Sequence, residues 1–210
     1  MLTAAQVLEQ QRAEHPGAEG FMPGEAAIVM RRPTPAEFLA LASVVERKRR
    51  GHVFLDPAKV HKPVLALLVH GRDEAETELA ECPAFESQLY DLASELAGAE
   101  DIAIEDAPEL VAENPKAKQL IGLKVCDVPL IVRKIDKFDW QRHNGNVVSM
   151  PSVSEAVAQL ALDQLMEQPD KTGARPQWDA LCARYPALPI ELGSELQRRA
   201  KSRAERIAGK

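Results

Sequence analysis

Aromatic residues and cysteines are scarce in this chain. Only 4% of its 210 residues are Phe, Trp or Tyr, too few for a typical β-sandwich, an RNA-binding aromatic platform or a carbohydrate-binding groove. The three cysteines, Cys82, Cys126 and Cys182, lie about fifty residues apart and form no Cys-x-x-Cys pair. An odd and scattered set of this kind excludes a disulfide framework or a zinc knuckle.

Long apolar segments are also missing. The longest apolar run, residues 64–69, is far shorter than the roughly 20 residues that a membrane-spanning helix needs. The first residues lack the basic-then-apolar pattern of a signal peptide. Together with the unpaired cysteines, these features lead us to expect a protein of the reducing cytoplasm.

Local signatures of catalysis are absent as well. The sequence contains no P-loop, GxGxxG, HExxH, GxSxG or EF-hand spacing. Three histidines recur every nine residues from His52, but this spacing places successive side chains on opposite faces of a helix. We expect no enzyme, no metal and no cofactor. The alternative is a small enzyme with a non-local site around Cys126 and His143, aided by Asp127 and Asp139.

The chain is rich instead in Ala, Leu, Val and Ile, and it has fifteen prolines against eleven glycines. This composition favours helices with defined starts and stops. Three segments open with a capping pattern, a Ser or Thr followed three residues later by Glu or Gln: residues 3–6, 34–37 and 152–155. We expect an α+β fold that is mainly α.

The two halves of the chain differ in charge. The formal net charge is −6, which gives no general affinity for phosphate backbones. Residues 1–105 carry 10 Lys and Arg against 18 Asp and Glu, whereas residues 106–210 carry 16 against 14. Basic side chains cluster on an expected terminal helix, at Arg198, Arg199, Lys201, Arg203 and Arg206. They complement the dipole of that helix or form a docking tail, for which we favour an acidic protein over nucleic acid.

Two landmarks repeat along the chain. Residues 28–38 (IVMRRPTPAEF) align with residues 130–140 (LIVRKIDKFDW) at an offset of 102, in the order apolar, basic, cap, acidic and aromatic. Residues 79–85 align with residues 182–188 at an offset of 103. Two matches at nearly one offset suggest a duplicated module of roughly 75–80 residues. The alternative is chance similarity between Ala- and Leu-rich helical segments.

The repeat predicts two related modules, each a short strand or hairpin followed by three to four short helices. Their expected order is an N-terminal helix and linker (1–20), module 1 (21–98), an acidic linker (99–124), and module 2 with the basic C-terminal helix (125–210). Residues 136–150 leave two alternatives open. The His-Asn-Gly-Asn sequence at residues 143–146 signals a hairpin, whereas a strand over residues 129–135 followed by a short helix or irregular run would match the repeat.

Basic and aromatic side chains around the repeated landmark are candidates for protein interaction. Two basic pairs follow the expected strands at matching positions, where charged side chains face solvent or form a docking edge. The tryptophans can anchor an interface or fill a core. The candidates are Arg31, Arg32, Phe38, Arg133, Lys134, Phe138, Trp140 and Trp178.

The run of residues 28–38, followed by residues 64–69 (VLALLV), 80–85 (AECPAF) and 92–98 (LASELAG), resembles small tailed-phage proteins of the tail-assembly-chaperone type. The resemblance covers about residues 26–98 and, more faintly, 128–200, where the Pro-Thr-Pro element is replaced. It implies a non-enzymatic phage morphogenesis protein of the host cytoplasm that binds another phage protein, such as a helical tape measure, or a further copy of itself. A structural virion component, such as a baseplate, connector or tail subunit, is the alternative.

Overall fold

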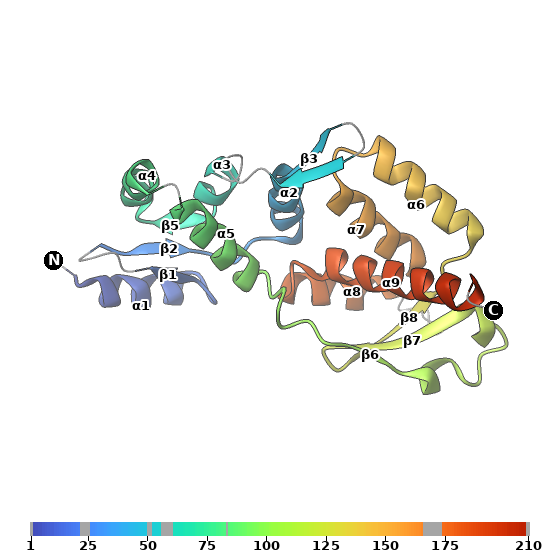
Figure 1. Cartoon of the computed structure of the whole chain (residues 1–210). Helices are drawn as coiled ribbons and strands as arrows, with labels where there is room; N and C mark the ends of the chain where they lie inside the picture. Colours follow the sequence, from blue (N-terminus) through green and yellow to red (C-terminus); the bar gives the residue numbers. More distant parts are fainter. Residues whose placement is uncertain are drawn as a thin grey trace. The chain divides into compact units, whose positions relative to one another are not determined.

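The computed structural model describes residues 2–21, 26–49, 52–55, 61–82, 84–165 and 174–208. It divides into two compact units, unit 1 (Met1–Ala99) and unit 2 (Glu100–Lys210), each of which is described by itself (Figure 1). With 61% helix and 15% strand, the fold is mainly helical with small antiparallel sheets. The expected α+β, mainly α class is therefore confirmed.

Unit 1 is organised around a three-stranded antiparallel sheet in the order β1-β2-β5. Every residue of the central strand β2 is buried, as expected of a continuous apolar run covered on both faces. The sheet strands are β1 (Glu19–Phe21), β2 (Ile28–Met30) and β5 (Leu68–His70); a separate pair is formed by β3 (Glu46–Arg49) and β4 (His52–Leu55). The helices are α1 (Ala4–Glu14), α2 (Pro35–Val45), α3 (His61–Leu65), α4 (Arg72–Glu81) and α5 (Phe85–Leu96).

Capping boxes start two helices of unit 1. The backbone N–H of Gln6 donates to the Thr3 hydroxyl (3.3 Å), and the Gln6 side chain accepts from the Thr3 N–H (2.9 Å). Thr34 and Glu37 make the same reciprocal pair before α2, at 3.2 and 2.8 Å. These bonds satisfy backbone donors that the first helical turn leaves without partners. Both predicted helix starts are confirmed.

Unit 2 begins with an antiparallel meander, β6-β7-β8, in which Leu123 pairs with Leu130. The strands are β6 (Ile104–Asp106), β7 (Leu120–Val125) and β8 (Val128–Arg133), and two short 3₁₀ helices, η2 (Pro108–Val111) and η3 (Ala117–Gln119), separate β6 from β7. Cys126 and Asp127 form the tight turn between β7 and β8, both with positive φ. Two left-handed residues are what a two-residue hairpin turn requires.

Four helices follow the meander: α6 (Lys137–Ser149), α7 (Val153–Gln164), α8 (Ala174–Arg184) and α9 (Leu188–Ala208). One face of the sheet packs against α7, α8 and α9 in a continuous core that includes Leu130 and Trp178. In Figure 1, α7 lies against both α6 and α9. Gly193 permits the contact between α7 and α9, because a Cβ at this position would lie 2.0 Å from the carbonyl oxygen of Val157.

The acidic linker expected over residues 99–124 is wrong. This segment contains β6, both 3₁₀ helices and most of β7. Its acidic residues, such as Glu105 and Asp106, are exposed, while Leu120 and Leu123 are buried in the sheet. The acidic composition therefore reflects the solvent side of a folded segment. Residues 19–20, expected in the N-terminal linker, belong to β1.

The hairpin alternative for residues 136–150 is also wrong, because this segment forms α6. Asp136 caps the helix by accepting from the backbone N–H groups of Phe138 and Asp139, both at 2.8 Å. The Asn-Gly pair lies inside the helix. Both units thus contain a strand followed by a capped helix at the repeated landmark, β2 to α2 and β8 to α6. The strand order differs, since β5 joins the first sheet only after α3, whereas the second sheet is a simple meander.

Candidate functional site

The repeated landmark forms the same clamp in both units. In unit 1, the Arg31 guanidinium holds the Glu37 carboxylate through two bonds of 2.7 and 3.0 Å, and that carboxylate also accepts from the Thr34 N–H. These bonds hold the pKa of Glu37 at about 2, with the Arg31 bond as the largest cause. The clamp ties the end of β2 to the first turn of α2.

In unit 2, Arg133 takes the place of Arg31 and Asp139 takes the place of Glu37. Arg133 Nη2 lies 2.7 Å from Asp139 Oδ1, and Asp139 Oδ2 accepts from the backbone N–H of Asp136 at 3.1 Å. Asp139 is only 3% exposed. Burial raises its pKa, but the bonds from Arg133 and from the Asp136 backbone outweigh burial, so the pKa lies below its ordinary value. The carboxylate is therefore charged and paired in the interior.

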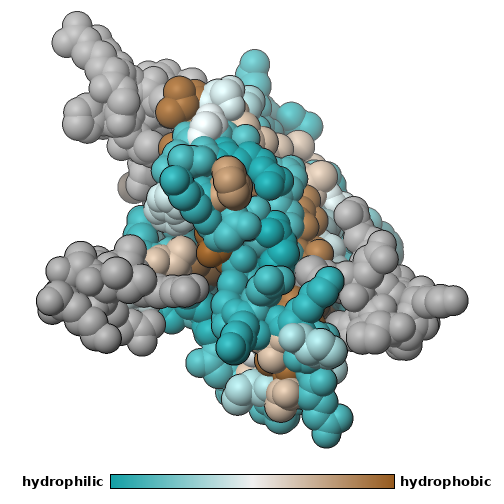
Figure 2. All heavy atoms as spheres, turned by 90° about the vertical axis from the view of Figure 1, so that its right-hand side faces the viewer, coloured by the Kyte–Doolittle hydropathy of each residue, from teal (hydrophilic) through white to brown (hydrophobic). Residues whose placement is uncertain are grey.

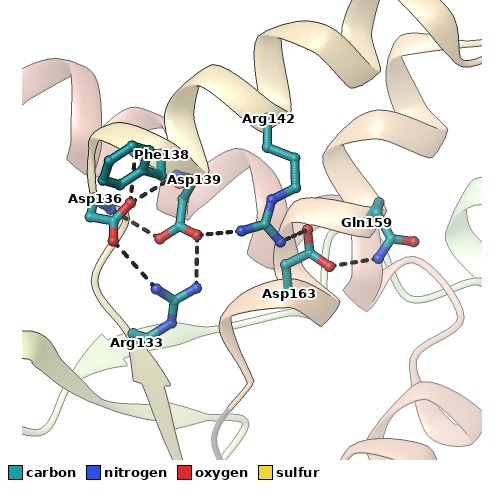
Figure 3. A network of polar contacts seen from close by, with 7 residues as sticks. All are labelled: Arg133, Asp136, Phe138, Asp139, Arg142, Gln159 and Asp163. Atoms are coloured by element: carbon teal, nitrogen blue, oxygen red, sulfur yellow. Dashed lines mark hydrogen bonds and ion pairs between the residues drawn. The ribbon is translucent and has the colours of Figure 1, made fainter.

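This second clamp extends along α6 and across to α7 (Figure 3). Arg142 contacts Asp139 Oδ1 at 3.2 Å and Asp163 of α7 at 3.5 Å, and the Gln159 side chain donates to Asp163 at 2.7 Å. Further along α6, His143 Nε2 lies 3.1 Å from the side-chain nitrogen of Gln197 on α9. The inner side of α6 is thus fastened to β8, α7 and α9.

The outer side of α6 faces solvent. Phe138 is 74% exposed and Val148 is 83% exposed, and Leu2 is the other exposed large hydrophobic residue in the described part of the chain. Phe138, Gln141, Gly145 and Val148 follow one another at spacings of three, four and three residues, so they form one line along the helix. We call this line the α6 seam. A Cβ added at Gly145 would meet nothing within 4 Å.

The predicted interaction residues fall into different environments. Phe38 and Trp178 are buried in the cores of their units, which corrects the interface role we expected for them. Trp140 is half-buried, with its ring 5.8 Å from that of His143. Arg32 is exposed and lies beside Gly17. Of the four aromatic candidates, two are therefore core residues, Trp140 is half-buried and Phe138 alone is exposed.

The basic residues of the terminal helix lie on α9. Arg198 and Arg199 line a groove of unit 2 together with Lys134, which the sequence does not place near them. Lys201 is exposed, and the side chains of Arg203 and Arg206 lie outside the described part of the chain. Two separately predicted basic groups thus meet at one surface.

Cys126 and His143 do not form a reactive pair. The Cys126 thiol lies 3.7 Å from the carbonyl oxygen of Asp101, while His143 faces Gln197. No hydrogen bond between Cys126 and His143 occurs in the described structure. Asp127 forms an ion pair with Lys124 at 3.4 Å, and Asp139 belongs to the clamp. The four residues of the enzyme alternative thus have separate partners.

Among the described residues, no group of three or more His, Cys, Asp and Glu side chains could hold a metal ion. None of the described helices is both long and apolar enough to span a membrane. No protein-family model matches the chain, and neither a curated protein nor a solved structure matches it.

Proposed function

We propose that the protein is a non-enzymatic protein-binding protein and that the α6 seam docks a helix of its partner. The observation that carries the proposal is the alignment of two highly exposed hydrophobic side chains, Phe138 and Val148, on one helix with Gly145 between them. Exposed apolar side chains gathered on one face mark interaction surfaces more often than single ones do. The spacing of the seam is that of helices packed against each other.

Gly145 supports a close helical contact. Glycine inside a helix costs roughly 1 kcal/mol relative to alanine. No neighbouring atom explains its presence, because the space beside it is open, and its φ is not positive. A second helix that crosses α6 at this point would approach more closely than an alanine allows. The glycine then has a role in the complex that it lacks in the free chain.

The charge beside the seam indicates the partner's chemistry. Lys137 lies on the exposed side of α6, and the nearest carboxylate, Asp136, is paired with Arg133. A partner helix with an apolar line flanked by carboxylates complements this surface. The clamp also fixes α6 before binding, so little conformational entropy is lost when the complex forms.

The other exposed residues of α6 near the seam, such as Lys137, Asn144 and Ser149, are polar. Figure 2, a view onto the side of the molecule that is at the right of Figure 1, shows a mostly hydrophilic surface on which hydrophobic residues form separate patches. A reversible complex needs such a local apolar patch within a polar surround, whereas a permanent subunit interface is more broadly apolar. This favours a partner that is bound and released.

The resemblance to tail-assembly chaperones supplies a specific partner, a helical tape-measure-like phage protein. A chaperone of this type binds its client during assembly and leaves it afterwards. The function we propose is therefore a phage morphogenesis factor that holds an exposed helix of a client. A structural virion component would use the same seam permanently.

The experiment is co-expression of the full chain with a tape-measure protein of the same source, followed by size-exclusion chromatography with light scattering. We expect a complex with the natural chain and a complex at least about tenfold weaker after the double substitution Phe138→Ser and Val148→Ser. Leu2→Ser is the matched control, because Leu2 is an exposed hydrophobic residue of unit 1. A complex that survives the double substitution contradicts the seam, and a fixed copy number in finished particles contradicts the chaperone role.

A further inference from the structure

A groove of unit 2 with a volume of about 690 Å³ lies beside the second half of α9. Its walls come from α9, from the segment of η2 and η3, from the start of β7, and from the residues between β8 and α6. The side chains that matter for its chemistry are Asp106, Lys118, Lys134, Arg198, Arg199 and Ser202. All of these elements belong to unit 2.

The floor of the groove is apolar. Leu120, Ile121 and Leu196 line it, with Ile135 at one side. Gly122 shapes this region, since a Cβ there would lie 2.0 Å from the carbonyl oxygen of Ala107, which precedes η2. The close approach lets η2 pack on β7. A groove of this kind can bury an apolar side chain of a ligand.

The rim of the groove is basic, but its basic side chains differ in whether a carboxylate already binds them. Arg198 holds Glu195 through two bonds of 2.6 and 2.7 Å, and Arg199 pairs with both Glu195 and Asp106. Lys134 Nζ donates only to the carbonyl oxygen of Lys118, at 2.9 Å. Within the described part of the chain, neither Lys118 nor Lys134 forms an ion pair with a carboxylate. Among the cationic residues that line the groove, Lys118 and Lys134 are thus the two that no carboxylate of the described residues pairs with.

We propose that this groove binds an acidic segment of another polypeptide, with a carboxylate at Lys118 and Lys134 and an adjacent apolar side chain on the floor. Ammonium groups without a carboxylate partner gain the most from an incoming anion, because no existing ion pair is broken. The apolar floor adds area that a free inorganic anion cannot cover. The site is separate from the α6 seam, and either can fail without the other.

Nucleic acid fits the groove less well. The lining contains no aromatic side chain on which a base could stack. The two arginines, which would hold phosphates through paired bonds, are already held by carboxylates. The chemistry therefore points to a polypeptide with few, spaced carboxylates.

The experiment measures binding of a fluorescein-labelled peptide of alternating glutamate and leucine to the full chain by fluorescence anisotropy at low salt. We expect affinity to fall about tenfold or more in the double variant Lys118→Glu and Lys134→Glu. The matched control is Lys124→Glu, the same charge change at an exposed position of β7 outside the groove. Circular dichroism establishes that each variant is folded.

The outcomes separate the alternatives. Loss of binding in the double variant but not in Lys124→Glu supports the proposal, and so does weaker binding of a polyglutamate peptide that lacks leucine. Equal binding to the natural chain and the double variant overturns it, as does the absence of measurable binding to the natural chain. Tighter binding of a single-stranded oligonucleotide than of the peptide also overturns it. A Phe138→Ser chain should bind the peptide like the natural chain.

Discussion

The guanidinium of Arg133 and the buried carboxylate of Asp139 are joined at 2.7 Å across the turn between β8 and α6. Arg31 and Glu37 make the same bond at the corresponding turn of unit 1, also at 2.7 Å. The pairs differ in burial: the Asp139 side chain is 2% exposed and the Glu37 side chain is 39% exposed. The same ion pair is therefore buried in unit 2 and partly exposed to solvent in unit 1. The effect of burial on its contribution to stability can be measured.

Asp139→Asn should lower the free energy of unfolding of unit 2 by about 2 kcal/mol, because Arg133 and Arg142 would then face each other without a shared anion. Glu37→Gln should lower that of unit 1 by less than about 1 kcal/mol, since solvent screens the more exposed pair. Urea unfolding measures both. Trp140 and Trp178, the two tryptophans of the chain, lie in unit 2 and report it by fluorescence, and circular dichroism reports both units. Equal losses would contradict the role of burial.

Unit 2 should lose stability as the pH falls below about 6.5. Burial lowers the pKa of His143 from its ordinary value of 6.5, and the Lys201 ammonium lowers it further, while the backbone of Ala156 acts in the opposite direction. Because the folded pKa is depressed, the unfolded chain takes up the proton first. The stabilisation is complete above pH 6.5 and is lost as the pH falls toward the folded pKa.

Tryptophan-detected unfolding at pH 7.5 and 5.5 tests this expectation. His143 is the one histidine in residues 100–210, so other histidines do not contribute to the signal from unit 2. His143→Gln should reduce the difference between the two pH values. A pH difference of the same size in this variant would show that another group is responsible.

The sequence predicts the local events of this fold better than the long-range ones. Thr3 and Thr34 open helices as expected, because a capping box needs only residues three positions apart. The His-Asn-Gly-Asn sequence at residues 143–146 fits a hairpin turn, but it also fits a helix that has Asn144 and Gly145 on its exposed side. The choice between hairpin and helix depends on β8, which pairs with β7. Most of β7 lies in the segment that the sequence predicts to be an acidic linker, so the sequence does not reveal this pairing.

The residues of the candidate site likewise include some that the sequence reveals and others that only the folded chain brings together. Arg133, Lys134 and Phe138 stand out in the sequence because they belong to the repeated landmark. Asp163 does not, since it reaches Arg142 only when α7 folds back against α6. Lys118 lies in the segment that the sequence predicts to be a linker, so the sequence does not place it beside Lys134. The spacing of Asp136 and Asp139, three residues apart, is the local signal that could have revealed the clamp.

Gly193→Ala should destabilise unit 2 by about 1–3 kcal/mol, because the new methyl group would lie 2.0 Å from the carbonyl oxygen of Val157 and push α9 away from α7. Helix propensity alone would predict a gain of up to about 1 kcal/mol from the same substitution. Thermal unfolding followed by tryptophan fluorescence distinguishes the two. A higher melting temperature would show that α7 and α9 are packed less closely than this.

Gly145→Ala should have opposite effects on the free chain and on the complex. The free chain should gain up to about 1 kcal/mol, because the alanine lies in open space on α6. Binding of the helical partner should weaken, since the added methyl group holds the second helix away from the seam. Thermal unfolding and the co-expression assay measure the two quantities. Full binding by a stabilised Gly145→Ala chain would mean that no helix crosses α6 at this point.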